Sequence, residues 1–476
     1  MLIGFVVAYL IISIAIGLWA ARKVHNTADF MTTGRQLPVI VVIAVVFATW
    51  FGAETVLGIP GEFMDSNLGG LISDPFGAAL CLILFGLFFA RKLYRMNLLT
   101  IGDFYRQRFD RRVEVVTGIA IVLSYLGWVA AQIMALGLVF NVLSDGAISE
   151  RHGILIGAAI VMIYTVVGGM WSVAMTTFFQ MIVILLGLAY VGWQVSDITG
   201  GVLPVIEHAV EADKFQFWPE LNTIAMLAFL SGLLTLGFGS IPQQDVFQRA
   251  NSARNENAAV CGTVIGGVLY LLFAAVPLFI AYSANLIDPA IIARFLDDDP
   301  QKILPELIKT HLPLFTQVVF YGSLLAVIMS TAAGTLLAPS VIISENLLKG
   351  VVKRELSDRQ LLTMTRWVVA GFTVAVTLYT LNASAMGTRI HTMVEDAYKV
   401  TLVIAFTPLV FGLYWSKATV RGAYWAIGFG LAVWLPLEWL LKDPAISPHF
   451  YGFFASIAGM LLGSLWPRKP LTATAQ

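Results

Sequence analysis

Long apolar stretches alternate with short polar connections along almost the whole chain. A helix needs about 20 apolar residues to cross the hydrocarbon core of a bilayer. Stretches of this kind occupy residues 2–21, 38–63, 70–90, 114–143, 153–170, 173–196, 222–241, 258–285, 314–346, 362–382, 393–414, 421–441 and 450–467. Only a short turn around Gly168, Gly169 and Trp171 separates the fifth from the sixth. The pattern predicts an all-α polytopic membrane protein with about thirteen transmembrane helices.

The composition agrees with this class, since 58% of residues are hydrophobic and 12% are charged. A formal net charge of +0 argues against a broadly basic surface that binds nucleic acid. Cys81 and Cys261 both lie in apolar stretches, so we interpret them as packing residues. The first apolar stretch has full spanning length and lacks a small-residue cleavage motif, so we expect it to be retained as a helix.

The distribution of Lys and Arg predicts the orientation. With the N-terminus outside, 21 of these residues, Arg249 among them, fall in cytoplasmic connections, 7 fall outside and Lys399 lies within a span. We therefore expect a multi-pass protein of the cell (inner) membrane with a cytoplasmic C-terminus. The longest polar connections, 197–221 and 286–313, would lie outside, where Asp297 to Asp299 fit a solvated loop or a short lid better than a metal site.

The second apolar stretch is interrupted in its middle. Residues 46–61 are as hydrophobic as a membrane helix, yet they contain Gly52, Gly58, Pro60, Gly61 and the carboxylate of Glu54. Within hydrocarbon such interruptions survive only where the backbone is buried in protein or lines a wet cavity. Discontinuous helices at the bilayer midplane form the binding sites of many secondary transporters. This segment predicts a transporter.

A second interrupted stretch, residues 230–242, follows five spans later and is again rich in Gly with a terminal Pro. Two broken helices in corresponding positions favour inverted five-helix repeats over residues 38–196 and 222–414, within one transmembrane transporter domain over 1–476. The alternative is that Gly serves here only for close helix packing.

Span nine places two hydroxyls, Ser330 and Thr331, side by side in an apolar helix. Hard cations such as sodium prefer oxygen ligands, which hydroxyls and the free carbonyls of a broken helix both supply. The alternative is that each hydroxyl bonds back to its own helix.

Several motifs resemble the sodium:solute symporter family, in the family's order and across residues 26–423. They are Asn26–Arg35, Thr100–Phe109, Val167–Val173, Ile241–Arg249, Ile328–Thr331 and Phe411–Ala423. The resemblance implies a leucine-transporter-like inverted-repeat fold and substrate uptake driven by a sodium gradient. Na⁺ is then the coupling ion, and no further cofactor is expected.

The resemblance also implies a sodium site. Its ligands would be the carbonyls of Ala48, Phe51 and Val327 and the side chains of Ser330 and Thr331. A small residue is usual at Val327, but only its backbone carbonyl is needed. Thr177 stands where the family usually has Asp, which leaves open the sodium stoichiometry and the choice of sodium over proton.

Within the family, residues 48–52, 86–90 and 127–130 are similar to the high-affinity choline transporter branch. Trp50 and Trp128 match two aromatic positions of that branch, and aromatic faces attract quaternary ammonium groups by cation–π interaction. Gln243 replaces a third aromatic residue, which suggests a more polar ligand such as an amino acid, a betaine-like zwitterion or another small cation. Both Trp residues could instead serve packing or interfacial anchoring.

Ionisable residues inside spans are functional candidates by default. Glu54, with Thr55 beside it, could attract a cationic substrate, take part in coupling or bond the unwound backbone. Glu395, Asp396 and Lys399 could form a one-face ion pair that is either a gate or a neutralised polar face, the latter slightly favoured.

We therefore predict a sodium-coupled symporter that imports a small organic solute by alternating access. The substrate would be a choline-like quaternary ammonium or a small zwitterion, with proline, betaine and pantothenate as alternatives. The expected partners are this substrate, Na⁺ and the bilayer, and the oligomeric state stays open. An enzyme is disfavoured because no nucleophile–base spacing or phosphate-binding loop occurs. A transporter-like membrane sensor and a passive channel are the alternatives from other classes.

Overall fold

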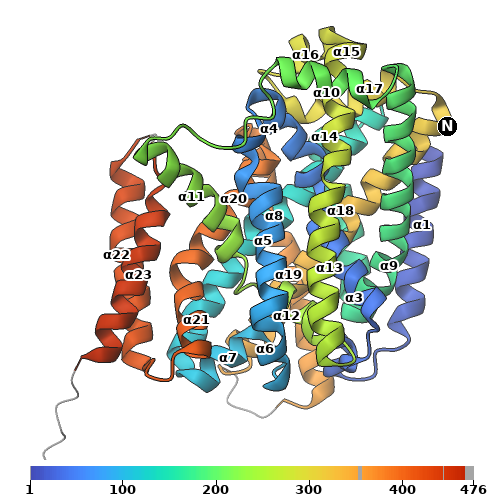
Figure 1. The fold of residues 1–476 in the computed structure, drawn as a ribbon. Coiled ribbons are helices and arrows are strands. Elements are labelled where there is room, and N and C mark those ends of the chain that lie inside the picture. The colour runs from blue at the N-terminus through green and yellow to red at the C-terminus, as the bar shows by residue number, and fades with distance from the viewer. Residues whose placement is uncertain (1, 352–355, 443, 467–476) are drawn as a thin grey trace, which may run out of the picture.

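The computed structural model describes residues 2–351, 356–442 and 444–466, and these residues are almost entirely helical (Figure 1). The helices are α1 Leu2–Ala21, α2 Thr27–Thr32, α3 Val39–Trp50, α4 Ile59–Asp65, α5 Ala78–Leu84, α6 Arg91–Arg95, α7 Ile101–Arg108, α8 Arg111–Leu143, α9 Glu150–Ile198, α10 Val202–Glu211, α11 Thr223–Gly239 and α12 Gln244–Asn251. They continue as α13 Glu256–Phe273, α14 Ala275–Tyr282, α15 Ala284–Ile287, α16 Pro289–Phe295, α17 Ile303–His311, α18 Leu314–Ile342, α19 Asp358–Ala385, α20 Ile390–Thr401, α21 Thr407–Tyr414, α22 Val420–Leu440 and α23 Pro448–Leu465.

Short segments of π or 3-10 helix continue several of these helices. They are η1 Thr33–Arg35, η2 Glu54–Gly58, η3 Leu68–Leu71, η4 Ile72–Gly77, η5 Phe85–Ala90, η6 Pro300–Lys302, η7 Ile343–Leu348 and η8 Leu402–Phe406. The sequence sets where many of the helices begin. Side chains of Asn26, Thr100, Asp110, Ser149, Asn222, Asn255, Ser357 and Thr419 each accept a bond from a backbone N–H of the first turn.

Helical segments occupy every apolar stretch that the sequence analysis identified. By length and composition, eight helices of the described residues could cross a membrane, or ten if each of two bent pairs counts as one span. The chain is therefore a polytopic helical protein, as predicted, while the count of thirteen spans stays a prediction.

The fifth and sixth predicted spans form one continuous helical element, α9, with a break at Gly169. This residue has a φ of +51°, a backbone region that L side chains rarely adopt. A Cβ atom there would also lie 2.5 Å from Cδ2 of Phe30. A glycine is therefore required at the bend, and the turn predicted around residues 168–171 is present.

Both predicted interruptions are present as bent helix pairs. The axes of Val39–Trp50 and Glu54–Asp65 differ by 53°, and those of Thr223–Gly239 and Gln244–Asn251 differ by 47°. The second pair extends further than the predicted span, which ended at residue 241. Arg249 was therefore misplaced in a cytoplasmic connection, because the structure buries it inside the helix bundle, where its side chain is 1% exposed.

The helices differ greatly in how much of their surface is buried by other parts of the protein. Helix α18 lies at the centre, with 94% of its most apolar window buried, whereas α22 at the periphery has only 22% of its window buried. In Figure 1 the α22–α23 pair stands at one side of the bundle. Ser330 and Thr331 lie on α18, so the two hydroxyls predicted as sodium ligands are in the protein core.

One end of the bundle carries the short helices α10, α15, α16 and α17, and we call it the lid end (Figure 1). Side chains tie this layer to the outer part of the first bent pair. The Lys214 ammonium donates to the carbonyls of Phe63, Met64 and Ser66 at 3.2, 2.7 and 2.6 Å, which satisfies the C-terminal end of α4. Arg389 pairs with Asp65 at 3.0 Å.

The predicted acidic connection of residues 286–313 forms part of this layer. Asp299 pairs with Lys302 at 3.0 Å, and Lys302 also reaches Glu150 at 3.1 Å. Among the described residues, no group of three or more His, Cys, Asp or Glu side chains could hold a metal ion. The connection forms the short helical segments α15, α16, η6 and α17, and its role as a lid stays a prediction.

Candidate functional site

The first break and the central helix α18 meet at the predicted sodium ligands. Ser330 Oγ lies 2.7 Å from the Ala48 carbonyl and 2.8 Å from that of Val327. Thr331 Oγ1 lies 3.4 Å from the Ala48 carbonyl. Two hydroxyls and two carbonyls thus converge in a fully buried place, which is the kind of oxygen-rich set that a hard cation prefers.

Two further residues of the predicted sodium region are also buried. Phe51 caps the end of α3 at the break, with φ and ψ of −82° and 76°, so the helix does not continue through it. Thr177 on α9 is fully buried, and its hydroxyl has no hydrogen-bond partner among the described residues. No hydrogen bond therefore joins Thr177 to Ser330 or Thr331.

The substrate candidates Trp50 and Trp128 lie against each other. Their ring centroids are 5.4 Å apart at an interplanar angle of 65°. Tyr398 of α20 completes the group, because its ring lies 6.3 Å from Trp50 and 5.7 Å from Trp128. We call Trp50, Trp128 and Tyr398 the aromatic cluster. All three side chains are at most 3% exposed.

Glu54 lies directly beside the aromatic cluster. Its Oε1 accepts a bond from Trp128 Nε1 at 3.0 Å, and its Oε2 accepts one from Gln132 Nε2 at 2.7 Å. The Gln132 carbonyl in turn accepts the N–H of Ala53 at 2.9 Å, a donor that the break leaves without a helical partner. Among the described residues, no Lys or Arg forms an ion pair with Glu54.

A second carboxylate, Asp245 of α12, also lies beside the aromatic cluster. It accepts bonds from Trp50 Nε1 at 3.1 Å and from the Tyr125 hydroxyl at 2.6 Å. Unlike Glu54, it has a cationic neighbour, since Arg249 Nη1 lies 3.6 Å from its Oδ2. Both members of this ion pair are at most 1% exposed.

Arg249 links the second bent pair to the first. Its Nε donates to Thr49 Oγ1 at 3.0 Å and to the Val45 carbonyl at 3.2 Å, both on α3. Its Nη2 has no hydrogen-bond partner among the described residues and faces α18, where a Cβ atom at Gly334 would lie 2.1 Å away. Gly334 therefore leaves the space that the guanidinium fills.

The other two predicted substrate residues lie next to the aromatic cluster but are held by other groups. Thr55 Oγ1 lies 3.3 Å from the Tyr270 hydroxyl and 3.4 Å from the Trp50 carbonyl. Gln243 donates to Ser124 Oγ at 2.8 Å and to Thr401 Oγ1 at 3.4 Å, and its carbonyl oxygen is buried without a partner among the described residues. Gln243 precedes the first turn of α12, two residues before Asp245.

Sequence reasoning missed Asp245, Arg249, Tyr125, Gln132 and Tyr398. A signal for the first two was available, because Asp245 and Arg249 are spaced i, i+4 directly after the second break, where a charged pair inside a membrane segment is a functional candidate. Tyr125, Gln132 and Tyr398 carry no such signal, since only packing brings α8 and α20 to the break.

The predicted gate forms one of its two available ion pairs. Lys399 Nζ lies 2.5 Å from Asp396 Oδ1, and the Asp396 side chain is 55% exposed. No ion pair joins Glu395 to Lys399 among the described residues. The Lys399 side chain is only 21% exposed, and the role of the pair as a gate or as a neutralised polar face stays a prediction.

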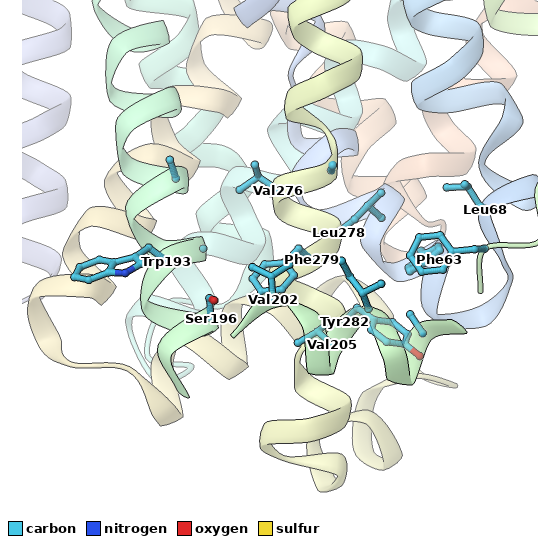
Figure 2. Close-up of a pocket in the computed structure, with 16 residues that line it drawn as sticks. Phe63, Leu68, Trp193, Ser196, Val202, Val205, Val276, Leu278, Phe279 and Tyr282 are labelled. Atoms are coloured by element: carbon cyan, nitrogen blue, oxygen red, sulfur yellow. The ribbon is translucent and has the colours of Figure 1, made fainter. Parts of the chain in front are cut away.

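The pocket in Figure 2 lies away from these groups, near the lid end, and has a volume of about 670 Å³. Its lining is apolar and includes Phe63, Trp193, Val205, Val276, Phe279 and Tyr282. The side chains of the aromatic cluster, by contrast, are at most 3% exposed in this structure.

The fold and the two breaks define the class of protein. A solved sodium-coupled sialic acid symporter, in a substrate-bound outward-open state, superposes with a TM-score of 0.79 at 18% identity over 97% of this chain and 96% of that one. Mhp1, a nucleobase-cation-symport-1 family transporter, superposes with a TM-score of 0.56 at 15% identity over 92% and 96%. The protein has the leucine-transporter-like fold of secondary transporters.

Residues 30–430 match the sodium:solute symporter family, and the chain belongs to this family. Similar proteins include high-affinity choline transporter 1 of Torpedo marmorata, 26% identical over 91% of this chain and 76% of the relative, and its human counterpart, 27% identical over 95% and 80%. The sodium/proline symporter of Escherichia coli K12 is 24% identical over 97% and 93%. The protein is therefore a multi-pass sodium-coupled symporter that binds Na⁺ and a small-molecule substrate.

Proposed function

We propose that this symporter imports a small organic cation of the choline type. The observation that carries the proposal is the aromatic cluster beside Glu54, a buried carboxylate with no cationic partner among the described residues. A quaternary ammonium has four carbon substituents on its nitrogen and no N–H to donate, so it is recognised by ring faces and by charge. The Nε1 atoms of both Trp residues already bond carboxylates, which leaves the ring faces for the substrate.

The rings touch one another in this structure, so the substrate must separate them when it enters. The Trp50 and Tyr398 planes are nearly parallel, at 18° and 6.3 Å between centroids. A trimethylammonium group needs more room than this gap gives. We infer that the structure is a closed state and that opening a path widens the cluster between the end of α3 and α20.

Sodium would bind at the carbonyls of Ala48, Phe51 and Val327 and the hydroxyls of Ser330 and Thr331. The support is the convergence of Ser330, Thr331 and the Ala48 carbonyl at the break, where a cation would join α3 to α18. We propose that sodium thereby stabilises the form that accepts substrate. The gradient and the membrane potential, worth about 2.3 kcal/mol per charge per 100 mV, then drive uptake.

The proposed topology keeps the lid end outside, with the N-terminus outside and the C-terminus in the cytoplasm of a bacterial-type inner membrane. The support is the excess of Lys and Arg in connections at the opposite end, around α6 and α7. Residues 38–196 and 222–414 would form the two inverted repeats, each beginning with one of the two bent pairs.

A zwitterion such as proline is the second candidate, because Arg249 Nη2 and the Gln243 carbonyl oxygen are both buried without partners among the described residues. Arg249 could bind a substrate carboxylate. However, this nitrogen lies against Gly334 on α18, which is not part of the aromatic cluster. The cation is therefore the preferred substrate.

Counterflow in proteoliposomes with choline, betaine, proline and pantothenate tests the substrate. We expect choline to exchange best, and to accumulate only while an inward sodium gradient is present. Accumulation that persists without the gradient would contradict sodium coupling. Preference for proline would favour the second candidate.

The aromatic cluster has a matched control. Trp128 donates to Glu54, and Trp434 on the peripheral helix α22 donates to Glu438 at 2.9 Å. We expect Trp128→Leu to weaken choline binding at least tenfold, while Trp128→Phe retains part of it and Trp434→Leu leaves it unchanged. Equal effects of the two Leu variants would contradict a substrate role for the cluster.

A further inference from the structure

Another buried carboxylate, Asp74, lies close to the first break but outside the aromatic cluster. It belongs to η4, within the span that follows the break, and is 3% exposed. The hydroxyl of Tyr270 on α13 donates to its Oδ1. That hydroxyl also lies 3.3 Å from Thr55 Oγ1. Asp74, Tyr270 and Thr55 therefore form a continuous polar chain that reaches the residue next to Glu54, where the Thr55 hydroxyl also donates to the Trp50 carbonyl at 3.4 Å.

No positive charge balances Asp74. Among the described residues no Lys, Arg or His forms an ion pair with it, and the charged groups that interact with it are the carboxylates of Glu54 on η2 and Glu395 on α20. This is the reverse of the surroundings of Asp245, which has Arg249. Unpaired charge in a dry membrane interior is costly and is functional by default.

The groups around Asp74 supply oxygen ligands. Besides its own carboxylate, they are the hydroxyls of Tyr270 and Thr55. The hydroxyl of the adjacent residue, Ser73, is buried and has no partner among the described residues. Carboxylate and hydroxyl oxygens suit a hard monovalent cation, and the carboxylate can also take a proton. None of these residues belongs to the sodium site between α3 and α18.

We propose that Asp74, with Tyr270, Thr55 and Ser73, binds a second coupling cation on the lid-end side of the substrate site. The inference rests on the proposed function in one respect, namely that the substrate's own charge compensates Glu54 and leaves Asp74 to the ion. One substrate molecule would then enter with two coupling cations. The second is either Na⁺ or a proton.

Direct cation binding to the purified transporter without substrate tests this proposal. Radioactive sodium binding is measured at saturation, and proton uptake is followed with a pH dye in weakly buffered solution. We expect two cations per wild-type protein. Asp74→Asn should bind one, Ser330→Ala with Thr331→Ala should also bind one, and the combined variant none. If the second cation is a proton, the Asp74 variant instead loses proton uptake and keeps its single sodium.

Removing the hydrogen bond from Tyr270 to Asp74 is a milder change to the same site than removing the Asp74 charge. Tyr270→Phe keeps the Asp74 charge but removes this bond, so we expect an unchanged number of bound cations and an affinity reduced about threefold to tenfold. This variant also tests the site if Asp74→Asn does not fold. Full cation binding by Asp74→Asn would overturn the proposal. So would an unchanged cation affinity in Tyr270→Phe.

Transport gives an independent readout. In proteoliposomes, the voltage at which net substrate flux reverses reports the number of charges moved per substrate. We expect this number to fall by one in Asp74→Asn, while counterflow, which needs no net ion movement, continues. If Asp74→Asn impaired counterflow but left the number of charges moved per substrate unchanged, Asp74 would be a substrate ligand, and the proposal would be overturned. Failure of choline to exchange on the wild type would refute the proposed substrate and leave the cation-binding result standing.

Discussion

The two bent helix pairs have similar bend angles, but the charges buried beside the two breaks differ. The break between α3 and η2 carries Glu54, whose partners Trp128 and Gln132 are both neutral. The break between α11 and α12 is followed by Asp245, which pairs with Arg249 in the same helix. The first break therefore holds a negative charge that a bound cation can balance, whereas the second already contains its counter-charge.

Because of this difference, we expect the two breaks to have different roles, one in stability and one in transport. A charge pair that is fully buried and internally balanced holds α12 against α3, through the bonds from Arg249 to Thr49 and Val45. An unbalanced carboxylate adds little to stability without a ligand, because burying it costs free energy. We expect the second break to respond to mutation mainly in stability and the first mainly in transport.

The largest expected effect is that of Arg249→Met. It leaves Asp245 buried without a counter-charge, so we expect the free energy of unfolding to fall by about 3–5 kcal/mol. Chemical unfolding in detergent micelles measures the change. Adding Asp245→Asn to the same chain should restore much of the loss. A single variant as stable as the wild type would show that the pair is not structural.

Glu54→Gln should act on substrate rather than on the fold. It removes the charge while an oxygen stays available to Trp128, so we expect the affinity for choline to fall about tenfold to a hundredfold. Glu438→Gln is the matched control, because Glu438 also accepts from a Trp. Equilibrium binding of radioactive choline measures both. Similar losses in the two variants would contradict a direct role for Glu54.

Ser330→Ala tests whether the first break also contains the sodium site. Loss of one oxygen near the Ala48 carbonyl should raise the sodium concentration for half-maximal uptake about tenfold. Ser340→Ala, on the same helix, removes a hydroxyl that bonds only its own helix at 2.8 Å from the Leu336 carbonyl. That control should keep the wild-type sodium dependence, and a shift of equal size in both would argue against the site.

Lys399→Met should have the smallest effect. Its ion pair with Asp396 is within one helix and partly exposed, so a change of about 0–1 kcal/mol in stability is expected. Initial uptake rates should change by less than about twofold if the pair is only a neutralised polar face. Abolished uptake with a normally folded protein would instead identify the pair as a gate.

Much of the architecture could be predicted because hydrophobic length and backbone interruption are local properties. The apolar stretches, the bend at Gly169 and both breaks follow from residues close together in sequence. The family motifs added the pairing of Ala48 with Ser330, which are distant in sequence and meet in the structure. The second break was predicted too short, because the apolar scan stopped where the charged residues of α12 begin.

The composition of the substrate region could be predicted only in part. Trp50, Trp128 and Glu54 stand out in the sequence as an aromatic pair and an intramembrane carboxylate, and they do meet. Tyr398 and Gln132 do not stand out, because a Tyr or Gln in a helix is usually a packing residue. Their positions depend on how α20 and α8 pack against η2.

The sequence by itself determined the helical class, the places where the backbone must break and the oxygen ligands offered to a cation, because apolar length, glycine and proline act within a few residues. Only the tertiary structure decided which charges are balanced. Whether Glu54, Asp74 and Asp245 have a counter-ion depends on helices far apart in the chain, and it is fixed when packing excludes water from the space between them.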